Sequence, residues 1–409
     1  MPLSTARMRT TLALASVAGL AVPLLGGAAA AAGTGRPAVA AATWSRVTPA
    51  GTNIIDDIGL ARGNDGVLHV LWTGDGTSNL GIMDTPISAN GTVGKAVTIA
   101  RFFLPTDPDA TVTPTGIAAI WNGIQTSQPN SAMGTFEATR PLSGGQWTVP
   151  TTHVPPLPAT PFTSSSDTAA TGSDGKPWVA FDGTDSLAVD HFGHPEVQLG
   201  PTNQCCVIEP GLGTDGQTGT TWVTYASIIS GQQGVFARQL QASGQPAGPA
   251  KLLPGSGAGG SALQPAQRVG TTGRGSGAGG VYAVYEHGFP DATALDVDRL
   301  GSSTPTAVAH FTGTAERLGG STLTATPSGR LWVAWFFGNG TPPALFVRLS
   351  NAGATSYGTA EKIALPAGTT AVWKVYLSAQ ATKVDVLALV TQHGNNSDAA
   401  YWDAQVPQP

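Results

Sequence analysis

The stretch CCVIEPGLGTDGQTGTTWVTYAS, residues 205–227, carries the pattern that organises the rest of the chain. After a polar start it continues as a short strand of small residues, turns at Asp215-Gly216, and ends in a second strand that closes with Tyr225. Asp-Gly is a favoured pair in tight hairpin turns, and aromatic and β-branched residues are enriched in strands. The stretch therefore predicts a β-hairpin.

The same unit recurs along the chain, and its second strand closes on a large apolar residue every 44 to 60 residues, at Trp72, Trp121, Phe181, Tyr225, Tyr285, Trp335 and Val390. Four strands of five or six residues with their turns need about 40–50 residues. The spacing predicts an all-β fold, a seven-bladed β-propeller with four-stranded antiparallel blades. A six-bladed propeller and a pair of β-sandwiches are the alternatives. No helix of three turns is expected after residue 41.

The two strands of each hairpin have different compositions. The first strands are rich in small residues such as Gly59, Ala61 and Ala169, which suit the crowded axis of a propeller. The second strands are bulky and are expected to pack between blades. Six tryptophans are therefore predicted to be core residues: Trp72, Trp121, Trp178, Trp222, Trp332 and Trp335. Residues 101–114 and 244–260 are interpreted as long connections.

The repeated unit resembles those of sialidase-like, Asp-box-type β-propellers from secreted bacterial proteins. The segment Ser173-Asp174-Gly175-Lys176-Pro177-Trp178 approximates the Asp-box pattern of that family, but in this register it joins the two inner strands of a blade. The family's sialidases also use three arginines and a Tyr–Glu pair. Arg317 is the one arginine well placed here, and the adjacent Tyr285 and Glu286 would point to opposite faces of a strand. Ordinary sialidase activity is therefore not expected.

The first 41 residues are interpreted as a signal peptide. Arg7 and Arg9 precede an apolar segment at 11–25, and Ala38-Val39-Ala40 matches a signal-peptidase site. The apolar run is too short for a membrane anchor. We therefore expect residues 42–409 to form one propeller domain that is secreted, extracellular and free of the membrane after cleavage.

Composition limits the class of partner. Charged residues make up 11% of the chain, the net charge is -5, and no run of lysines or arginines stands out after residue 41, so nucleic-acid binding is not expected. The 54 glycines and 31 prolines suit many short strands joined by tight turns. The protein is expected to be a monomer.

Polar residues gather where the first strands begin and the second strands end, and these points share one end of a propeller. Loops converge there, and a concave site is expected. The candidate ligand-binding residues are Cys205, Cys206, Asp56, Asp57, Asp167, Asp182, Glu209, Glu286, His287, Arg317 and His393. The carboxylates that could catalyse glycoside cleavage are Asp57, Asp167, Glu209 and Glu286.

Cys205 and Cys206 are the only cysteines, and an exported protein meets an oxidising compartment. We expect a vicinal disulfide, although adjacent Cα atoms lie about 3.8 Å apart, below the usual disulfide range. Such strain is found mainly at functional sites. Two free thiols or an intermolecular bridge are the alternatives.

The sequence thus predicts a propeller that binds a ligand, a glycan or cell-envelope polymer, in a central funnel beside the cysteine pair. One alternative is a glycoside hydrolase or lyase that uses the funnel carboxylates. Another is a protein-interaction propeller without a catalytic site. No cofactor is required, although calcium could be held by Asp56 and Asp57 or by Asp182 and Asp185.

Overall fold

The computed structural model describes residues 42–52, 57–74, 80–103, 105–125, 134–152, 167–182, 187–199, 207–227, 232–257, 270–273, 279–287, 292–302, 304–311, 318–338, 342–394 and 396–409. These residues form strands β1 to β28 and a single short 3-10 helix, η1 (Asn396–Asp398). None of them forms a helix long and apolar enough to cross a membrane. The all-β class predicted from the sequence is confirmed.

Most strands form four-stranded antiparallel sheets in which consecutive strands are neighbours. The first of these sheets contains β10 (Asp167–Thr171), β11 (Pro177–Asp182), β12 (Leu187–His191) and β13 (Val197–Gln198), and the second contains β14 (Val207–Thr214), β15 (Thr221–Ser227), β16 (Gly234–Leu240) and β17 (Lys251–Leu252). The third contains β18 (Gly270–Gly273), β19 (Val281–His287), β20 (Ala294–Arg299) and β21 (Thr306–His310). The fourth contains β22 (Leu318–Ala325), β23 (Leu331–Phe337), β24 (Ala344–Leu349) and β25 (Glu361–Ile363).

Both ends of the chain contribute to the fifth four-stranded sheet, which contains β26 (Thr369–Ala379), β27 (Lys383–Gln392), β28 (Ala400–Pro407) and β1 (Ser45–Arg46). Ser45 pairs with Asp403 and Arg46 with Trp402, so the first described strand completes the sheet of the last three. This pairing ties the two ends of the fold together.

The remaining strands form one eight-stranded sheet that contains two successive meanders. The first is β2 (Gly59–Arg62), β3 (Leu68–Gly74), β4 (Leu80–Ile87) and β5 (Val97–Phe103), and the second is β6 (Asp109–Val112), β7 (Ile117–Gln125), β8 (Gly134–Arg140) and β9 (Thr151–Thr152). They are joined where Phe102 and Phe103 of β5 pair with Gln125 and Ile124 of β7.

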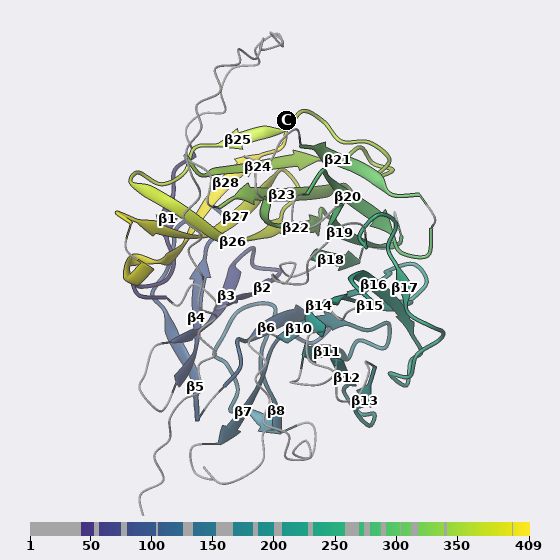
Figure 1. Ribbon diagram of the computed structural model, residues 1–409. Coiled ribbons are helices and arrows are strands. Elements are labelled where there is room, and N and C mark those ends of the chain that lie inside the picture. Colours follow the sequence, from purple (N-terminus) through teal and green to yellow (C-terminus); the bar gives the residue numbers. More distant parts are fainter. Residues whose placement is uncertain are drawn as a thin grey trace, which may run out of the picture. The chain divides into compact units, whose positions relative to one another are not determined.

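The first strands of the meanders contact one another in a closed cycle, in the order β2, β6, β10, β14, β18, β22, β26 and back to β2. Figure 1 shows these strands around the centre, with later strands of each sheet farther out. Antiparallel four-stranded sheets arranged radially around an axis are the architecture of a β-propeller. The prediction that first strands are innermost is confirmed.

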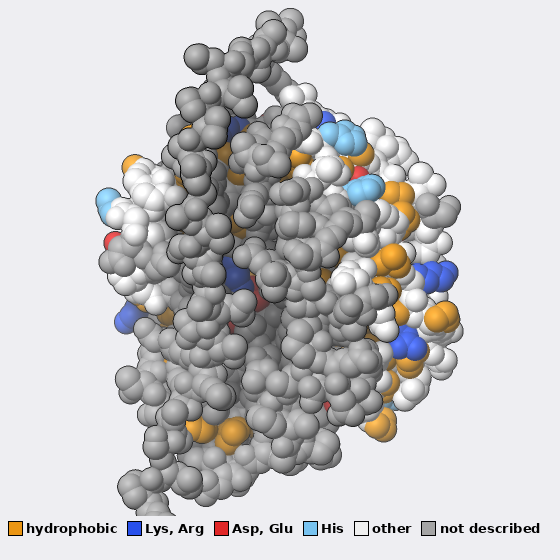
Figure 2. All heavy atoms as spheres, in the orientation of Figure 1, with side chains coloured by type: hydrophobic (Ala, Val, Ile, Leu, Met, Phe, Trp, Pro, Cys, Tyr) orange, Lys and Arg blue, Asp and Glu red, His pale blue; other side chains and the backbone are white. Residues whose placement is uncertain are grey.

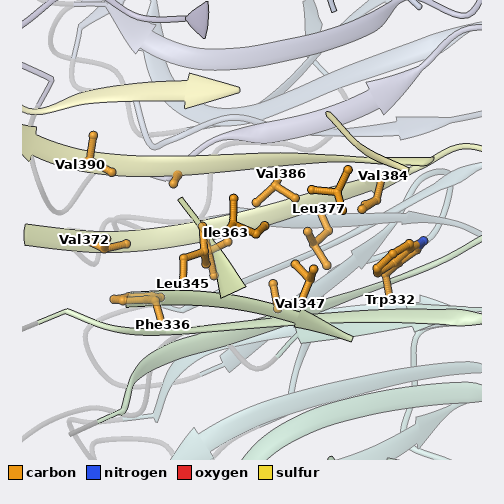
Figure 3. Packing of buried hydrophobic residues seen from close by; sticks show 14 of the residues in the cluster. Trp332, Phe336, Leu345, Val347, Ile363, Val372, Leu377, Val384, Val386 and Val390 are labelled. Carbon is orange, nitrogen blue, oxygen red and sulfur yellow. The ribbon is translucent and has the colours of Figure 1, made fainter. Parts of the chain in front are cut away.

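The hydrophobic core lies between neighbouring sheets. Side chains alternate along each strand, so in β3 Leu68, Val70 and Trp72 pack with β27, whereas Leu71 packs with β7. Figure 3 shows the cluster in which β26 and β27 meet β23 and β24, including the almost fully buried Trp332.

Five of the six tryptophans predicted to be core residues are buried: Trp72, Trp121, Trp178, Trp332 and Trp335. Trp222 is only partly buried and packs against a neighbouring cluster.

The interpretation of residues 101–114 as one long connection is wrong, because this segment contains the end of β5 and all of β6. The sequence around β6 is interrupted by Pro105, Pro108 and Pro114, which obscured the four-residue strand between them. The segment 244–260 likewise contains the short strand β17, and its other described residues lie in bends, a turn at 254–257 and irregular backbone. The turn at Asp174-Gly175 does join β10 to β11, as predicted, and Gly175 has φ +80°, which favours glycine.

Candidate functional site

The candidate site lies at the end of the ring where the innermost strands begin. Three of these strands have an irregular register at that end, between Ile208 and Gly211 in β14, between Leu318 and Gly320 in β22, and between Val372 and Lys374 in β26. Bulges redirect side chains and are common beside binding sites. In β26 the irregularity immediately precedes Lys374.

A buried charged cluster joins the last sheet to the first. The Nζ atom of Lys374 lies 2.6 Å from Oδ1 of Asp57, and the hydroxyl of Tyr376 donates a hydrogen bond to the same oxygen. Asp57 is 3% exposed. A carboxylate removed from water needs such charged and hydrogen-bonding partners, so this cluster orients Lys374 and Tyr376 of β26 toward the start of β2.

Two further aspartates extend the cluster to the next meander. Oδ2 of Asp107 accepts a hydrogen bond of 2.9 Å from the backbone N–H of Asp57, and Oδ2 of Asp109 accepts one of 2.7 Å from the N–H of Ala169 in β10. Both side chains are buried. Three carboxylates and one ammonium from the described part of the chain therefore gather across β26, β2, β6 and β10.

Figure 2 shows this end of the molecule. Basic and acidic side chains lie near its centre, in the region where Figure 1 labels β26, β2 and β6. Charged groups are thus present at the centre of this face as well as at its rim.

Of the residues predicted for the site, Asp57 lies in this cluster. The backbone positions of three others are described without their side chains: Asp167 begins β10, Asp182 ends β11, and Glu209 lies in the irregular part of β14. These positions share the end of the ring where Asp57 lies. Four predicted residues lie outside the described part of the chain: Asp56, Cys205, Cys206 and Arg317.

Glu286 and His287 end strand β19 on the same side of the ring. Nδ1 of His287 lies 3.1 Å from Oδ2 of Asp296, and its side chain is 41% exposed. Tyr285 donates a 3.0 Å hydrogen bond to the carbonyl of Pro254, and the alternation of side chains places Glu286 on the opposite face. Tyr285 and Glu286 thus do not form a pair through adjacency. Burial raises the pKa of Glu286 to about 7.

His393 does not join the buried cluster. It is exposed in the turn after β27, has a left-handed φ of 57°, and its ring lies beside Gly368 at the start of β26. It is a rim residue of this face.

Replacing Glu286 by glutamine is expected to flatten the pH dependence of stability between the ordinary pKa of 4.5 and the raised pKa of about 7. The folded state favours the protonated carboxyl, so the wild type should lose stability as pH rises through this interval, because the unfolded chain releases its proton first. Glutamine cannot titrate, so between pH 5 and pH 8 the Tm of the variant should fall by a few degrees less than that of the wild type. Thermal unfolding at pH 5, 6, 7 and 8 measures this, and equal slopes would contradict it.

Sequence reasoning missed Asp107, Asp109 and Tyr376 as site residues. The first two fell in the segment interpreted as a connection. The sequence did contain a signal for this strand, because an aspartate begins both β6 (Asp109) and β10 (Asp167). Aligning Asp109-Ala110-Thr111 with Asp167-Thr168-Ala169 would have identified the missing first strand. Tyr376 gave no such signal, because its contact with Asp57 spans 319 positions.

Among the described residues, no group of three or more histidines, cysteines, aspartates and glutamates is arranged to hold a metal ion. Asp57, Asp107 and Asp109 make hydrogen bonds and one ion pair with other parts of the protein. The arrangement thus groups carboxylates, an ammonium and a phenol at one end of the ring.

No protein-family model and no curated protein matches the chain. Among solved structures it is similar to an α-L-arabinofuranosidase from Fusarium graminearum (11% identity, 89% of this chain and 97% of that chain, TM-score 0.48). It is also similar to an α-L-arabinanase from Penicillium chrysogenum (11%, 89% and 98%, 0.46) and to a six-bladed lectin from Aleuria aurantia (13%, 73% and 93%, 0.42). At these TM-scores the likenesses decide nothing about activity, and the propeller assignment rests on the strand topology.

Proposed function

We propose that the protein is a secreted β-propeller that binds a hydroxyl-rich ligand, a glycan or cell-envelope polymer, at the end of the ring where Asp57 lies. The observation that carries this proposal is the buried cluster of Asp57, Asp107, Lys374 and Tyr376. Carboxylates accept hydrogen bonds from hydroxyl groups, and the ammonium and phenol donate them. With three carboxylates and one ammonium in the described part, the preferred ligand is neutral or cationic rather than acidic.

The proposal includes seven blades, with the eight-stranded sheet counted as two. The cycle of first strands, which has seven members from β2 to β26, supports this count. It also includes export by cleavage after residue 41 and a vicinal disulfide between Cys205 and Cys206, supported by the sequence pattern alone. The sialidase-like type is proposed only as a distant resemblance, since an acid-rich centre is a poor receptor for a carboxylate sugar.

Glycoside hydrolysis is the second candidate function. One observation favours it: Glu286, at the same end of the ring, has a pKa raised to about 7 by burial. A carboxyl that keeps its proton near neutral pH can act as a general acid. An ionised aspartate on another strand would then be the second carboxylate of the reaction.

A glycan array, followed by mass spectrometry of each bound sugar, distinguishes these functions. The array would include neutral, amino and acidic bacterial and plant glycans, probed with the purified protein. Binding of intact neutral or amino sugars is the expected result. Cleaved sugars would replace the binding function with the hydrolase, and the absence of binding to every glycan would overturn the glycan proposal in favour of a protein partner.

A further inference from the structure

A second buried charged group lies where the last sheet meets the first, away from the candidate site. The Nη2 atom of Arg62, at the end of β2, lies 2.5 Å from Oδ2 of Asp385 in β27. Asp403 of β28 interacts electrostatically with both Arg62 and Asp385. Asp385 and Asp403 are 0% and 1% exposed. The group thus spans three strands on the two sides of this junction.

The two carboxylates lie on the same face of the sheet. Asp385 pairs with Gln405, and Asp403 is two residues from Gln405 along β28, so the two aspartates are diagonal neighbours. Asp385 is well supplied with donors: Arg62 and Gln380 (2.9 Å) at Oδ2, and Gln405 (2.9 Å) at Oδ1. By contrast, Oδ1 of Asp403 is buried without a hydrogen-bond partner among the described residues.

When both aspartates are ionised, neither of the two nearby cations forms an ion pair with Asp403 among the described residues. Arg62 supplies one positive charge and is already paired with Asp385. Lys383, at the start of β27, directs its ammonium to Gln405 (2.6 Å) and to the carbonyl of Ala89 (2.5 Å). On β1, Arg46 donates to the carbonyl of Thr48, and the neighbouring β26 contributes the neutral Ser378. A buried carboxylate without compensation is costly, and taking up a proton is the cheaper state.

Burial, reinforced by the nearby Asp385, raises the pKa of Asp403 to about 8, while Arg62 and Lys383 oppose the shift. Asp403 also lies where the first described strand joins the last sheet, because it is the residue of β28 that pairs with Ser45 of β1. Its protonation state therefore acts directly on the strand pair that ties the two ends of the fold together.

We propose that the junction between β28, β1 and β2 is a proton-dependent closure, in which a neutral Asp403, buried with an unpartnered carboxyl oxygen, holds the ring shut and its ionisation loosens it. This device does not depend on the ligand-binding function. Its two states differ by one proton on Asp403, while Arg62 stays charged.

Thermal unfolding of wild type and Asp403→Asn from pH 5 to pH 9.5 tests the proposal. The folded pKa of about 8 exceeds the ordinary value of 3.8, so the wild type should lose stability as pH rises between these values and level off above about 8. Asparagine mimics the neutral acid. The difference in Tm between the two proteins should be small near pH 5, just above the ordinary pKa, and the variant should melt several degrees higher than the wild type at pH 9. Parallel curves would overturn the proposal.

Two further measurements keep the test decisive. Asp385→Asn, which removes the partner of Arg62, should lower Tm at pH 5, where Asp403→Asn does not. If Asp403→Asn fails to fold, the proposal is tested by hydrogen–deuterium exchange of the wild type at pH 7 and pH 9. The measured rates are corrected for the pH dependence of intrinsic amide exchange. Amides of β1 and β28 should lose protection at pH 9 relative to those of β11 and β12, and uniform protection would overturn the proposal.

Discussion

Gly59→Ala is expected to destabilise the protein by about 3 kcal/mol or more, which is the upper range for overpacking a core. A Cβ atom on Gly59 would lie 2.6 Å from Cα of Asp109, 2.7 Å from its carbonyl carbon and 2.8 Å from the nitrogen of Ala110. These are backbone atoms of the neighbouring first strand, β6, so no side-chain rotation can relieve the contact. Strands β2 and β6 would have to separate.

Gly248→Ala is the matched control, because no atom lies within 4 Å of the position of its Cβ. Urea denaturation of the two variants and the wild type measures the effect as a shift of the midpoint. The control should unfold with the wild type. If Gly59→Ala also unfolded at the wild-type midpoint, strands β2 and β6 could not lie as close together as these distances require.

Lys374→Met is expected to weaken ligand binding by about 100-fold, since the ligand would lose a hydrogen bond from a charged donor, which is worth roughly 1.5–3 kcal/mol. The methionine fills a similar volume but cannot donate to a hydroxyl group or neutralise Asp57. Titration calorimetry with a sugar selected on the glycan array measures the loss. Lys362→Met is the control, because Lys362 is exposed on the outer strand β25. Its affinity should equal that of the wild type.

The Lys374→Met variant also leaves the carboxylate of Asp57 buried beside Tyr376 without the ammonium of Lys374. The variant is therefore expected to lose folding stability as well as affinity. Lys374→Met combined with Asp57→Asn removes both charges and should restore Tm toward the wild-type value. Binding should remain weak in this double variant. Recovery of binding together with Tm would show that Lys374 has a structural role alone and would contradict the proposed site.

The hairpins could be predicted from sequence because each carries its own local signal. The second strands contain bulky residues such as Trp332 and Trp335, and the turn at Asp174-Gly175 needs only local geometry. Strand β6 carries little of this signal, since it has four residues, Asp109–Val112, between prolines. Missing that strand also meant missing Asp107 and Asp109.

The site itself could be located but not assembled from sequence. Asp57 was predicted at this end of the ring, but its 2.6 Å contact with Lys374 joins residues 317 positions apart. Such a contact depends on how the ring closes, which in turn depends on β1 pairing with β28. No local pattern in the two-residue strand Ser45–Arg46 predicts that pairing.

A crystal structure of the protein soaked with a neutral oligosaccharide selected on the array tests the central claim most directly. Sugar hydroxyl groups are expected within hydrogen-bonding distance of the cluster formed by Asp57, Asp107, Lys374 and Tyr376. A sugar bound between outer strands or on the opposite end of the ring, with this cluster unchanged, would contradict it.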